Sequence, residues 1–272
     1  MTQPLNVQTG FVSINGAQLY YETAGVGQPL VLVHAGIADS RMWESQFAAF
    51  AQHYRVVSYD MRGFGQSQMV AGPFDHQDDL YELLRFLRIE RAYFVGCSRG
   101  GANCIDLTLE HPEMVGALIL VGSALGGYRY PGGYPQTMID ADEALERGDI
   151  ELGNELEIQT WIDGASRTPD QVDPAVRNLV LDMNRIALMT PDIGVEERID
   201  PPAVGRLGEI HTPTLVIIGD LDTPRTLAAA DILASSIAGA RRATIEGTTH
   251  LPNMEKPAEF NQIVMGFIGN IA

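Results

Sequence analysis

Residues 92–101 read AYFVGCSRGG, an apolar run of strand length that ends in the pattern Gly-x-Ser-x-Gly. A helix-like segment, 101–109, follows at once, so Ser98 lies at a strand-to-helix turn. In a nucleophile elbow such a turn is strained and lifts the serine hydroxyl above the sheet. Glycines two residues to either side are needed because strand and helix pass too close for a Cβ atom. The stretch therefore predicts that Ser98 is a nucleophile.

The five-residue pattern alone is a weak signal, because a Gly-rich turn between strand and helix is common in α/β proteins. A serine hydroxyl is also a poor nucleophile unless a base lies within hydrogen-bond reach. The prediction therefore depends on whether a base, an orienting acid and oxyanion donors occur at suitable places in the chain.

Composition indicates a globular protein of 272 residues, with 45% hydrophobic and 19% charged residues. This length fits one large domain, or one domain with an inserted subdomain. The longest apolar runs, 30–33 and 117–121, are strand-sized and far shorter than a membrane span. Residues 1–8 lack the pattern of a signal peptide, so we expect a cytoplasmic protein that does not associate with membranes.

The formal net charge is −17, from 18 basic and 35 acidic residues. Nucleic acids and anionic membranes need a basic patch, so neither is an expected partner. The histidines are scattered and no Cys/His cluster has metal-ligand spacing, so no metal is expected. Cys97 and Cys104 lie seven residues apart across a turn, which is poor geometry for a disulfide and favours buried packing.

Strand-like and helix-like segments alternate along the chain, which predicts a mostly parallel α/β sheet with helices on both faces. The expected strands are 11–14, 18–22, 29–34, 55–59, 93–97, 114–121, 214–218 and 242–246. The expected helices are 42–51, 75–87, 101–109, 224–237 and 257–268. In such sheets sites form at the carboxyl ends of strands. Residues 34, 60, 98, 222 and 250, which are polar, all fall there.

Residues 125–211 interrupt this alternation and predict an inserted helical cap over the strand ends. The insertion opens with a Gly-, Tyr- and Pro-rich tract and carries 17 Asp and Glu against 7 Arg. Residues 1–124 and 212–272 would then form the core. A solvated outer face is the simplest interpretation of the acidic charge.

Several separate motifs together resemble the α/β-hydrolase superfamily, in its capped serine esterase and lactonase branch. One is the elbow around Ser98, and another is DMRGFGQS at 60–67, which matches the family's Asp-x-Arg-Gly-x-Gly-x-Ser. The resemblance covers essentially the whole chain and includes 3-oxoadipate enol-lactonases, arylesterases, acyl-homoserine lactone hydrolases and cofactor-free haloperoxidases. In this family the order along the chain is nucleophile, acid, base.

The resemblance supplies candidates for the remaining catalytic groups. His250 follows the last strand in EGTTHLP (246–252) and is the expected general base. The family pattern Gly-x-x-Asp in GDLDTP (219–224) places the orienting acid at Asp222, with Asp220 as the competitor that would cap a turn.

The oxyanion hole needs two N–H donors, and the resemblance implies the backbone N–H groups of Arg99 and Gly36. The loop at 34–36 reads HAG where relatives usually have His-Gly-x, so Gly36 takes the donor position and His34 braces the loop. Arg62 of the DMRGFGQS motif is expected to pair with a carboxylate. The Arg99 side chain either forms a salt bridge to the acidic cap or contacts substrate.

The resemblance implies hydrolysis of a carboxylic ester or lactone through an acyl-enzyme on Ser98, without a cofactor. Candidate substrates are acyl-homoserine lactones and small neutral esters. The alternatives are a haloperoxidase or perhydrolase, a C–C bond hydrolase, or a sensor that binds a ligand without turnover. Among cap residues, we expect Tyr128, Trp161, Met183 and Met189 to line the substrate pocket. The sequence leaves the oligomeric state open.

Overall fold

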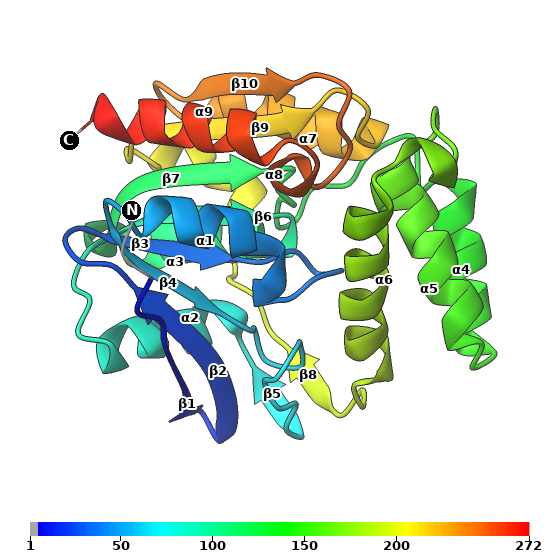
Figure 1. Cartoon of the computed structure of the whole chain (residues 1–272), viewed down its shortest axis with the longest axis horizontal. Coiled ribbons are helices and arrows are strands. Elements are labelled where there is room, and N and C mark those ends of the chain that lie inside the picture. Colours follow the sequence, from blue (N-terminus) through cyan, green and yellow to red (C-terminus); the bar gives the residue numbers. More distant parts are fainter. Residues whose placement is uncertain (1–4, 272) are drawn as a thin grey trace.

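The computed structural model describes residues 5–271 and is built around an eight-stranded sheet (Figure 1). The strand order is β1-β2-β4-β3-β6-β7-β9-β10. These strands are β1 (Gln8–Ile14), β2 (Ala17–Ala24), β3 (Pro29–Val33), β4 (Arg55–Tyr59), β6 (Ala92–Cys97), β7 (Val115–Val121), β9 (Thr214–Gly219) and β10 (Arg241–Ile245). Strand β2 pairs antiparallel with β1 and β4, and every other pair in this sheet is parallel. The predicted mostly parallel sheet is confirmed.

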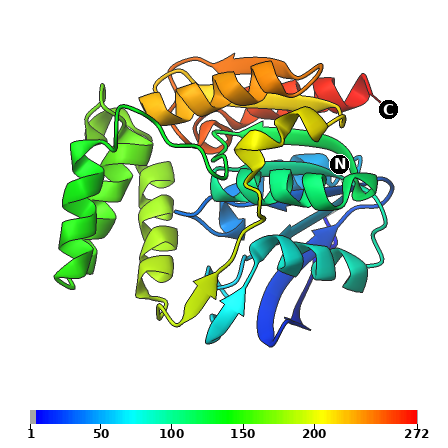
Figure 2. The same cartoon turned by 180° about the vertical axis from the view of Figure 1, so that it is seen from behind.

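Helices cover both faces of the sheet. Helices α1 (Glu44–Phe50) and α9 (Pro257–Gly269) lie on the face toward the viewer in Figure 1. Helices α2 (His76–Phe86), α3 (Arg99–Glu110) and α7 (Pro224–Ser236) lie on the opposite face, which Figure 2 turns to the front. The central strands are therefore buried on both sides, as their continuous apolar runs predict.

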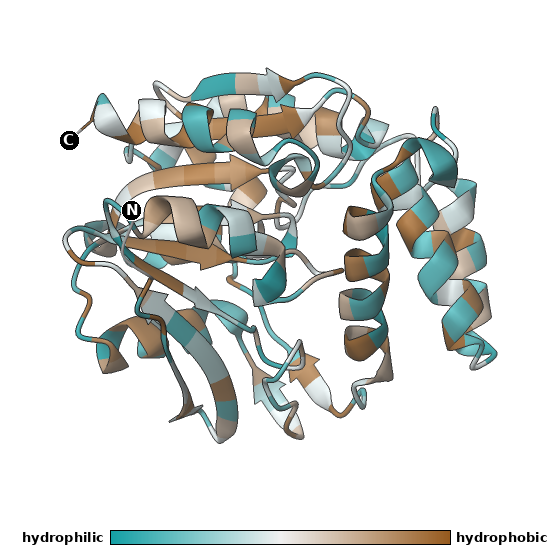
Figure 3. Cartoon of the chain, in the orientation of Figure 1, coloured by the Kyte–Doolittle hydropathy of each residue, from teal (hydrophilic) through white to brown (hydrophobic). Residues whose placement is uncertain are grey.

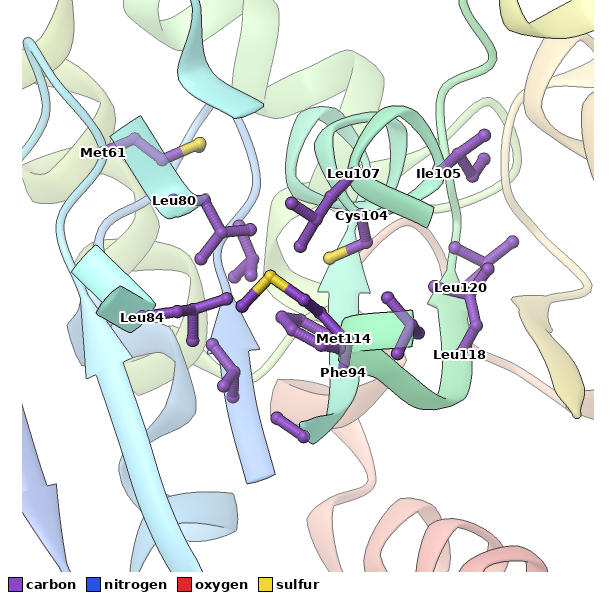
Figure 4. Packing of buried hydrophobic residues seen from close by; sticks show 14 of the residues in the cluster. Met61, Leu80, Leu84, Phe94, Cys104, Ile105, Leu107, Met114, Leu118 and Leu120 are labelled. Atoms are coloured by element: carbon purple, nitrogen blue, oxygen red, sulfur yellow. The ribbon is translucent and has the colours of Figure 1, made fainter. Parts of the chain in front are cut away.

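Alternate side chains of each central strand enter different apolar clusters, because successive residues of a strand point to opposite faces. In β3, Val31 and Val33 join the cluster under α2, α3 and α7, while Leu30 and Leu32 join the cluster under α1 and α9. The first cluster is shown in Figure 4, where Phe94 from β6 lies among helix and strand side chains. Hydropathy colouring shows the central strands as the most apolar part of the molecule (Figure 3). None of the helices in residues 5–271 combines the length and apolar character needed to cross a bilayer.

The segment that the sequence analysis expects to be a cap lies beside the carboxyl ends of the central strands (Figures 1 and 2). It contains α4 (Gln136–Glu146), α5 (Ile150–Ile158), a π-helical turn (Gln159–Asp163) and α6 (Pro174–Met189). Helix α6 stands between the sheet and the pair α4 and α5. The segment then returns to the core through β8, described next.

A second, two-stranded sheet joins this segment to the core. Strand β8 (Gly194–Glu196) pairs in parallel with β5 (Gly72–Phe74). The sequence analysis expected neither strand, because each has three residues and Val195 at the centre of β8 is 62% exposed. Hydrophobic periodicity cannot identify so short and open a strand.

Candidate active site

Ser98 lies at the turn between β6 and α3, in a strained backbone conformation with φ of +51° and ψ of −115°. Positive φ is uncommon for a residue with a Cβ and marks a constrained site. Three hydrogen bonds hold the turn. The Ser98 N–H donates to the Val121 carbonyl at 2.9 Å, and the Ser98 carbonyl accepts from the N–H groups of Ala102 at 3.1 Å and Ala124 at 3.0 Å.

Two flanking glycines allow this turn to form. A Cβ on Gly96 would lie 2.6 Å from the Gly100 carbonyl oxygen, and a Cβ on Gly100 would lie 2.4 Å from the Val33 carbonyl oxygen. Both distances are too short for any side chain. The glycines of the Gly-x-Ser-x-Gly pattern are therefore required by close backbone contacts, as expected for an elbow.

Asp222 and His250 meet at the same edge of the sheet. The Asp222 Oδ2 lies 2.8 Å from His250 Nδ1, and both side chains are almost fully buried. The Thr223 N–H donates to Asp222 Oδ1 at 2.6 Å and fixes the carboxylate. The alternative acid, Asp220, instead accepts the Gly247 N–H at 2.5 Å and caps a turn. A carboxylate on Nδ1 selects the imidazole tautomer whose Nε2 can accept a proton.

The end of β7 brings the serine close to this pair. Val121 accepts the Ser98 N–H, and the next residue, Gly122, lies against both partners. A Cβ there would be 3.2 Å from His250 Nδ1 and 3.3 Å from Asp222 Oδ2. The His250 carbonyl also lies 3.9 Å from the Sγ of Cys97, the residue before Ser98. Three residues far apart in sequence are thus gathered around one strand end.

The two residues expected to supply oxyanion donors are neighbours in the structure. Arg99 is the first residue of α3, and a Cβ on Gly36 would be 3.1 Å from the Arg99 Nε. His34 braces the loop: its Nε2 accepts the Met61 N–H at 2.9 Å, and its Nδ1 lies 2.8 Å from the Ala35 carbonyl oxygen. Burial lowers the pKa of His34 and keeps the ring neutral, which suits this pattern of one acceptor and one donor.

Two arginines around the elbow are ion-paired. The Arg62 guanidinium binds both oxygens of Asp79, at 2.7 and 2.8 Å, in a buried pair, as the sequence analysis expects. The Arg99 side chain pairs with Glu196 of β8. Of the two roles considered for Arg99, the structure shows the salt bridge to the acidic segment.

The thiols beside the site are packed into the core. Cys97 and Cys104 are both free and fully buried, as the sequence analysis expects. Burial raises the pKa of both thiols, so neither is present as a thiolate nucleophile at neutral pH.

The π-helical turn of residues 159–163 contacts His250 directly. The His250 N–H donates to the Trp161 carbonyl at 3.2 Å, and the two rings pack with centroids 4.5 Å apart. Trp161, expected as pocket lining, thus covers the imidazole.

Arg167 and Glu255 hold Thr249, the residue that precedes His250, and we name these three residues the loop anchor. The loop anchor is an ion pair combined with several hydrogen bonds. Arg167 Nη1 lies 2.6 Å from Glu255 Oε2, and Arg167 Nη2 donates to Thr249 Oγ1 at 3.0 Å. Glu255 also accepts the Thr249 N–H at 2.8 Å. The partners are up to 88 residues apart in sequence, and no local pattern marks them, so sequence reasoning missed this group.

The other expected pocket residues lie apart from one another. Tyr128 packs at the edge of the core, Met183 is fully buried, and Met189 at the end of α6 is 56% exposed. A cavity of about 720 Å³ is lined instead by parts of 130–137, 159–169 and 221–225. It includes Tyr130, Tyr134 and Asp222, whereas Ser98, His250 and the four residues expected to line the pocket are absent from its lining. Their role in binding substrate stays a prediction.

Comparison with known proteins identifies the family. The sequence matches the family described as alpha/beta hydrolase fold over residues 28–257. The chain belongs to this family. It is a hydrolase of the α/β-hydrolase fold. The elbow Ser98 comes first along the chain and is followed by the paired Asp222 and His250.

The relatives of this chain within the α/β-hydrolase family are named for different substrates. A 3-oxoadipate enol-lactonase of Acinetobacter baylyi is 28% identical over 239 residues, 86% of this chain and 85% of the relative. A 2-hydroxy-6-oxononadienedioate/2-hydroxy-6-oxononatrienedioate hydrolase of Paraburkholderia phymatum is 26% identical over 262 residues, 93% of this chain and 91% of the relative. The solved structure of Est816, described as an N-acyl homoserine lactone degrading enzyme, matches with a TM-score of 0.77 and 28% identity, covering 95% of this chain and all of that one.

Proposed function

We propose that this hydrolase cleaves carboxylic esters or lactones through an acyl-enzyme on Ser98. The observation that carries the proposal is the buried Asp222–His250 hydrogen bond of 2.8 Å, formed beside a serine held at positive φ. An elbow serine, an acid and a base, in this order along the chain, are the parts that acyl transfer by a serine nucleophile requires.

Each group has a defined role in the proposed mechanism. His250 Nε2 removes the Ser98 hydroxyl proton as the serine oxygen attacks the carbonyl carbon, and Asp222 stabilises the imidazolium that forms. The N–H groups of Arg99 and Gly36 donate to the developing oxyanion. The imidazolium then protonates the leaving alkoxide. Water, activated by the same His250, hydrolyses the acyl-enzyme and releases the acid.

Relatives and charge favour a neutral ester or lactone. An enol-lactonase and an acyl-homoserine lactone degrading enzyme are each 28% identical to this chain. The chain carries a net charge of −17, which makes it an unfavourable host for polyanionic substrates. Residues 125–211 would act as the cap, since Trp161 covers His250 and Glu196 holds Arg99. Candidate substrates are therefore acyl-homoserine lactones and small neutral esters.

C–C bond hydrolysis is the second candidate, because the dienedioate hydrolase relative matches 93% of the chain at 26% identity. The same triad could serve that reaction. Turnover of a vinylogous diketone in preference to any ester would favour it, just as halide-dependent bromination with peroxide would indicate a haloperoxidase.

The test compares acid release in a pH-stat by wild type, Ser98→Ala and Ser235→Ala. The substrates are a long-chain acyl-homoserine lactone and p-nitrophenyl butyrate. We expect Ser98→Ala to lower kcat by at least about 10⁴-fold, because loss of the nucleophile removes the covalent route. Ser235, on the exposed part of α7, is the control and should have no effect. Equal activity of Ser98→Ala and wild type would overturn the proposal, and the ratio of kcat/KM values would separate lactonase from esterase.

A further inference from the structure

A cavity lies beside the turn that carries Asp222, the proposed catalytic acid. At about 720 Å³ it falls within the size range of small-molecule sites. It is lined by the turn 221–225, which contains Asp222, and by parts of 130–137 and 159–169. Since neither Ser98 nor His250 lines it, a ligand bound here need not touch the reacting atoms.

Three of the charged groups around this cavity are already paired within the protein. Asp163 binds Arg177 at 2.9 Å, Arg167 binds Glu255 at 2.6 Å, and Asp222 binds His250 at 2.8 Å. Their charges are therefore compensated, and they offer little to a charged ligand.

Arg225 differs from these groups. No carboxylate in residues 5–271 forms an ion pair with it, and its guanidinium lies over the Tyr134 ring, 4.7 Å from the centroid. In a chain with 35 acidic residues, the one uncompensated charge in the cavity lining is positive. A guanidinium stacked on an aromatic ring keeps its N–H edge free to bind a carboxylate in bidentate fashion.

The uncharged lining fits the body of such a ligand. Tyr130 and Tyr134 contribute aromatic rings, and Pro135, Pro169 and Pro224 contribute apolar surface. Aromatic and apolar walls with a single convergent charged group are typical of small-molecule sites.

We propose that this cavity is a second binding site, apart from Ser98 and His250, that takes a small organic monocarboxylate with an aromatic or aliphatic body and holds its carboxylate on Arg225. The turn that carries Arg225 also carries Asp222, three residues earlier. A ligand bound to Arg225 therefore contacts the segment that positions Asp222. We expect it to change kcat rather than to compete with substrate for binding.

The test measures binding of 4-phenylbutyrate by isothermal titration calorimetry, with the uncharged amide, 4-phenylbutyramide, as the paired probe. We expect saturable binding of the acid and at least 10-fold weaker binding of the amide. Arg225→Gln should weaken binding of the acid at least 10-fold, and Arg225→Lys, which retains the charge, should weaken it less. The matched control is Arg241→Gln, since Arg241 also stacks on an aromatic ring, 5.9 Å from the Phe267 centroid, and lies outside the cavity.

Three results would overturn the proposal. One is equal binding of 4-phenylbutyrate to Arg225→Gln and wild type, with circular dichroism showing both folded. Another is an absence of saturable binding for both 4-phenylbutyrate and octanoate. The third is purely competitive inhibition of p-nitrophenyl butyrate hydrolysis with an inhibition constant equal to the Kd, which would place the ligand at the triad. A change in kcat with unchanged KM supports the second site.

Discussion

The two sides of the candidate active site are held by different kinds of contact. On the core side, Ser98 is fixed by backbone atoms: glycines that admit no Cβ and main-chain hydrogen bonds to Val121 and Ala124. On the side of residues 125–211, the contact of Trp161 with His250 is joined by two ion pairs, Arg167–Glu255 and Arg99–Glu196. Backbone contacts tolerate almost no change at a position, whereas ion pairs can be replaced if both partners change together.

Substituting glycines tests the core side and has the largest expected effect. A methyl group on Gly100 would lie 2.4 Å from the Val33 carbonyl oxygen and 2.5 Å from that of His34. Because backbone cannot easily move aside, we expect Gly100→Ala to lower the free energy of unfolding by more than about 3 kcal/mol. Urea denaturation followed by circular dichroism measures this change.

The control for the Gly100→Ala measurement is a glycine of the segment 125–211. Gly205 has no atom within 4 Å of its Cβ position, and we expect Gly205→Ala to change the free energy of unfolding by less than about 0.5 kcal/mol. Equal effects of the two substitutions would contradict the distinction between the backbone-limited elbow and the segment 125–211.

The same difference explains what the sequence could predict. Local patterns mark the strands, the elbow and the motifs that carry Ser98, Asp222 and His250. In each of them the apolar residues or required glycines are close neighbours in the sequence. The sheet is confirmed, and the structure brings Asp222 to His250 as the motif implies. The contacts of the loop anchor join residues up to 88 positions apart, and β8 is too short for hydrophobic periodicity to reveal it. Neither leaves a pattern in neighbouring residues.

Removing the loop anchor tests the second side, with a smaller expected effect. Arg167 and Glu255 are 13% and 9% exposed, so Arg167→Met leaves the Glu255 carboxylate buried without a positive charge to pair with. We expect a loss of about 2–3 kcal/mol in the free energy of unfolding, since breaking a buried pair strands a charge. Since Glu255 also fixes Thr249, next to His250, kcat should fall more than KM changes.

Two further variants test whether the loss of stability in Arg167→Met comes from the unpaired buried charge. Arg167→Met combined with Glu255→Gln should recover much of the stability, because no charge is then left unpaired. Arg147→Met removes an exposed pair of the same segment, with Glu143 at 3.8 Å, and should cost less than about 0.5 kcal/mol. Stability unchanged in Arg167→Met would show that the loop around His250 is held by the core alone.

Asp106 lies where the two sides meet and gives the smallest expected effect. It belongs to α3, its Oδ1 is buried without a hydrogen-bond partner, and its Oδ2 is 3.8 Å from Arg198. Burial, only partly offset by Arg198, raises the pKa of Asp106 to about 7 from an ordinary value of 3.8. Between about pH 4 and pH 7 the folded protein therefore keeps a proton that the unfolded chain has lost.

This difference in proton binding sets the sign of the pH dependence. Because the folded state binds more protons in that window, the contribution of Asp106 to stability falls as pH rises from about 4 to about 7 and then levels off. Each unit by which the folded and unfolded pKa values differ corresponds to about 1.4 kcal/mol of stability.

Replacing Asp106 by asparagine avoids the cost of ionisation, but the new amide N–H groups gain no partner, which offsets part of the benefit. We therefore expect Asp106→Asn to be about 1–2 kcal/mol more stable than wild type at pH 8 and to show a shallower fall between pH 4 and 7. Asp231→Asn, with a side chain 71% exposed, is the control and should follow the wild-type profile. Parallel profiles for wild type and Asp106→Asn across urea titrations at pH 5 and 8 would mean that Asp106 is ionised in the folded protein, held by Arg198 as one more ion pair between the two sides.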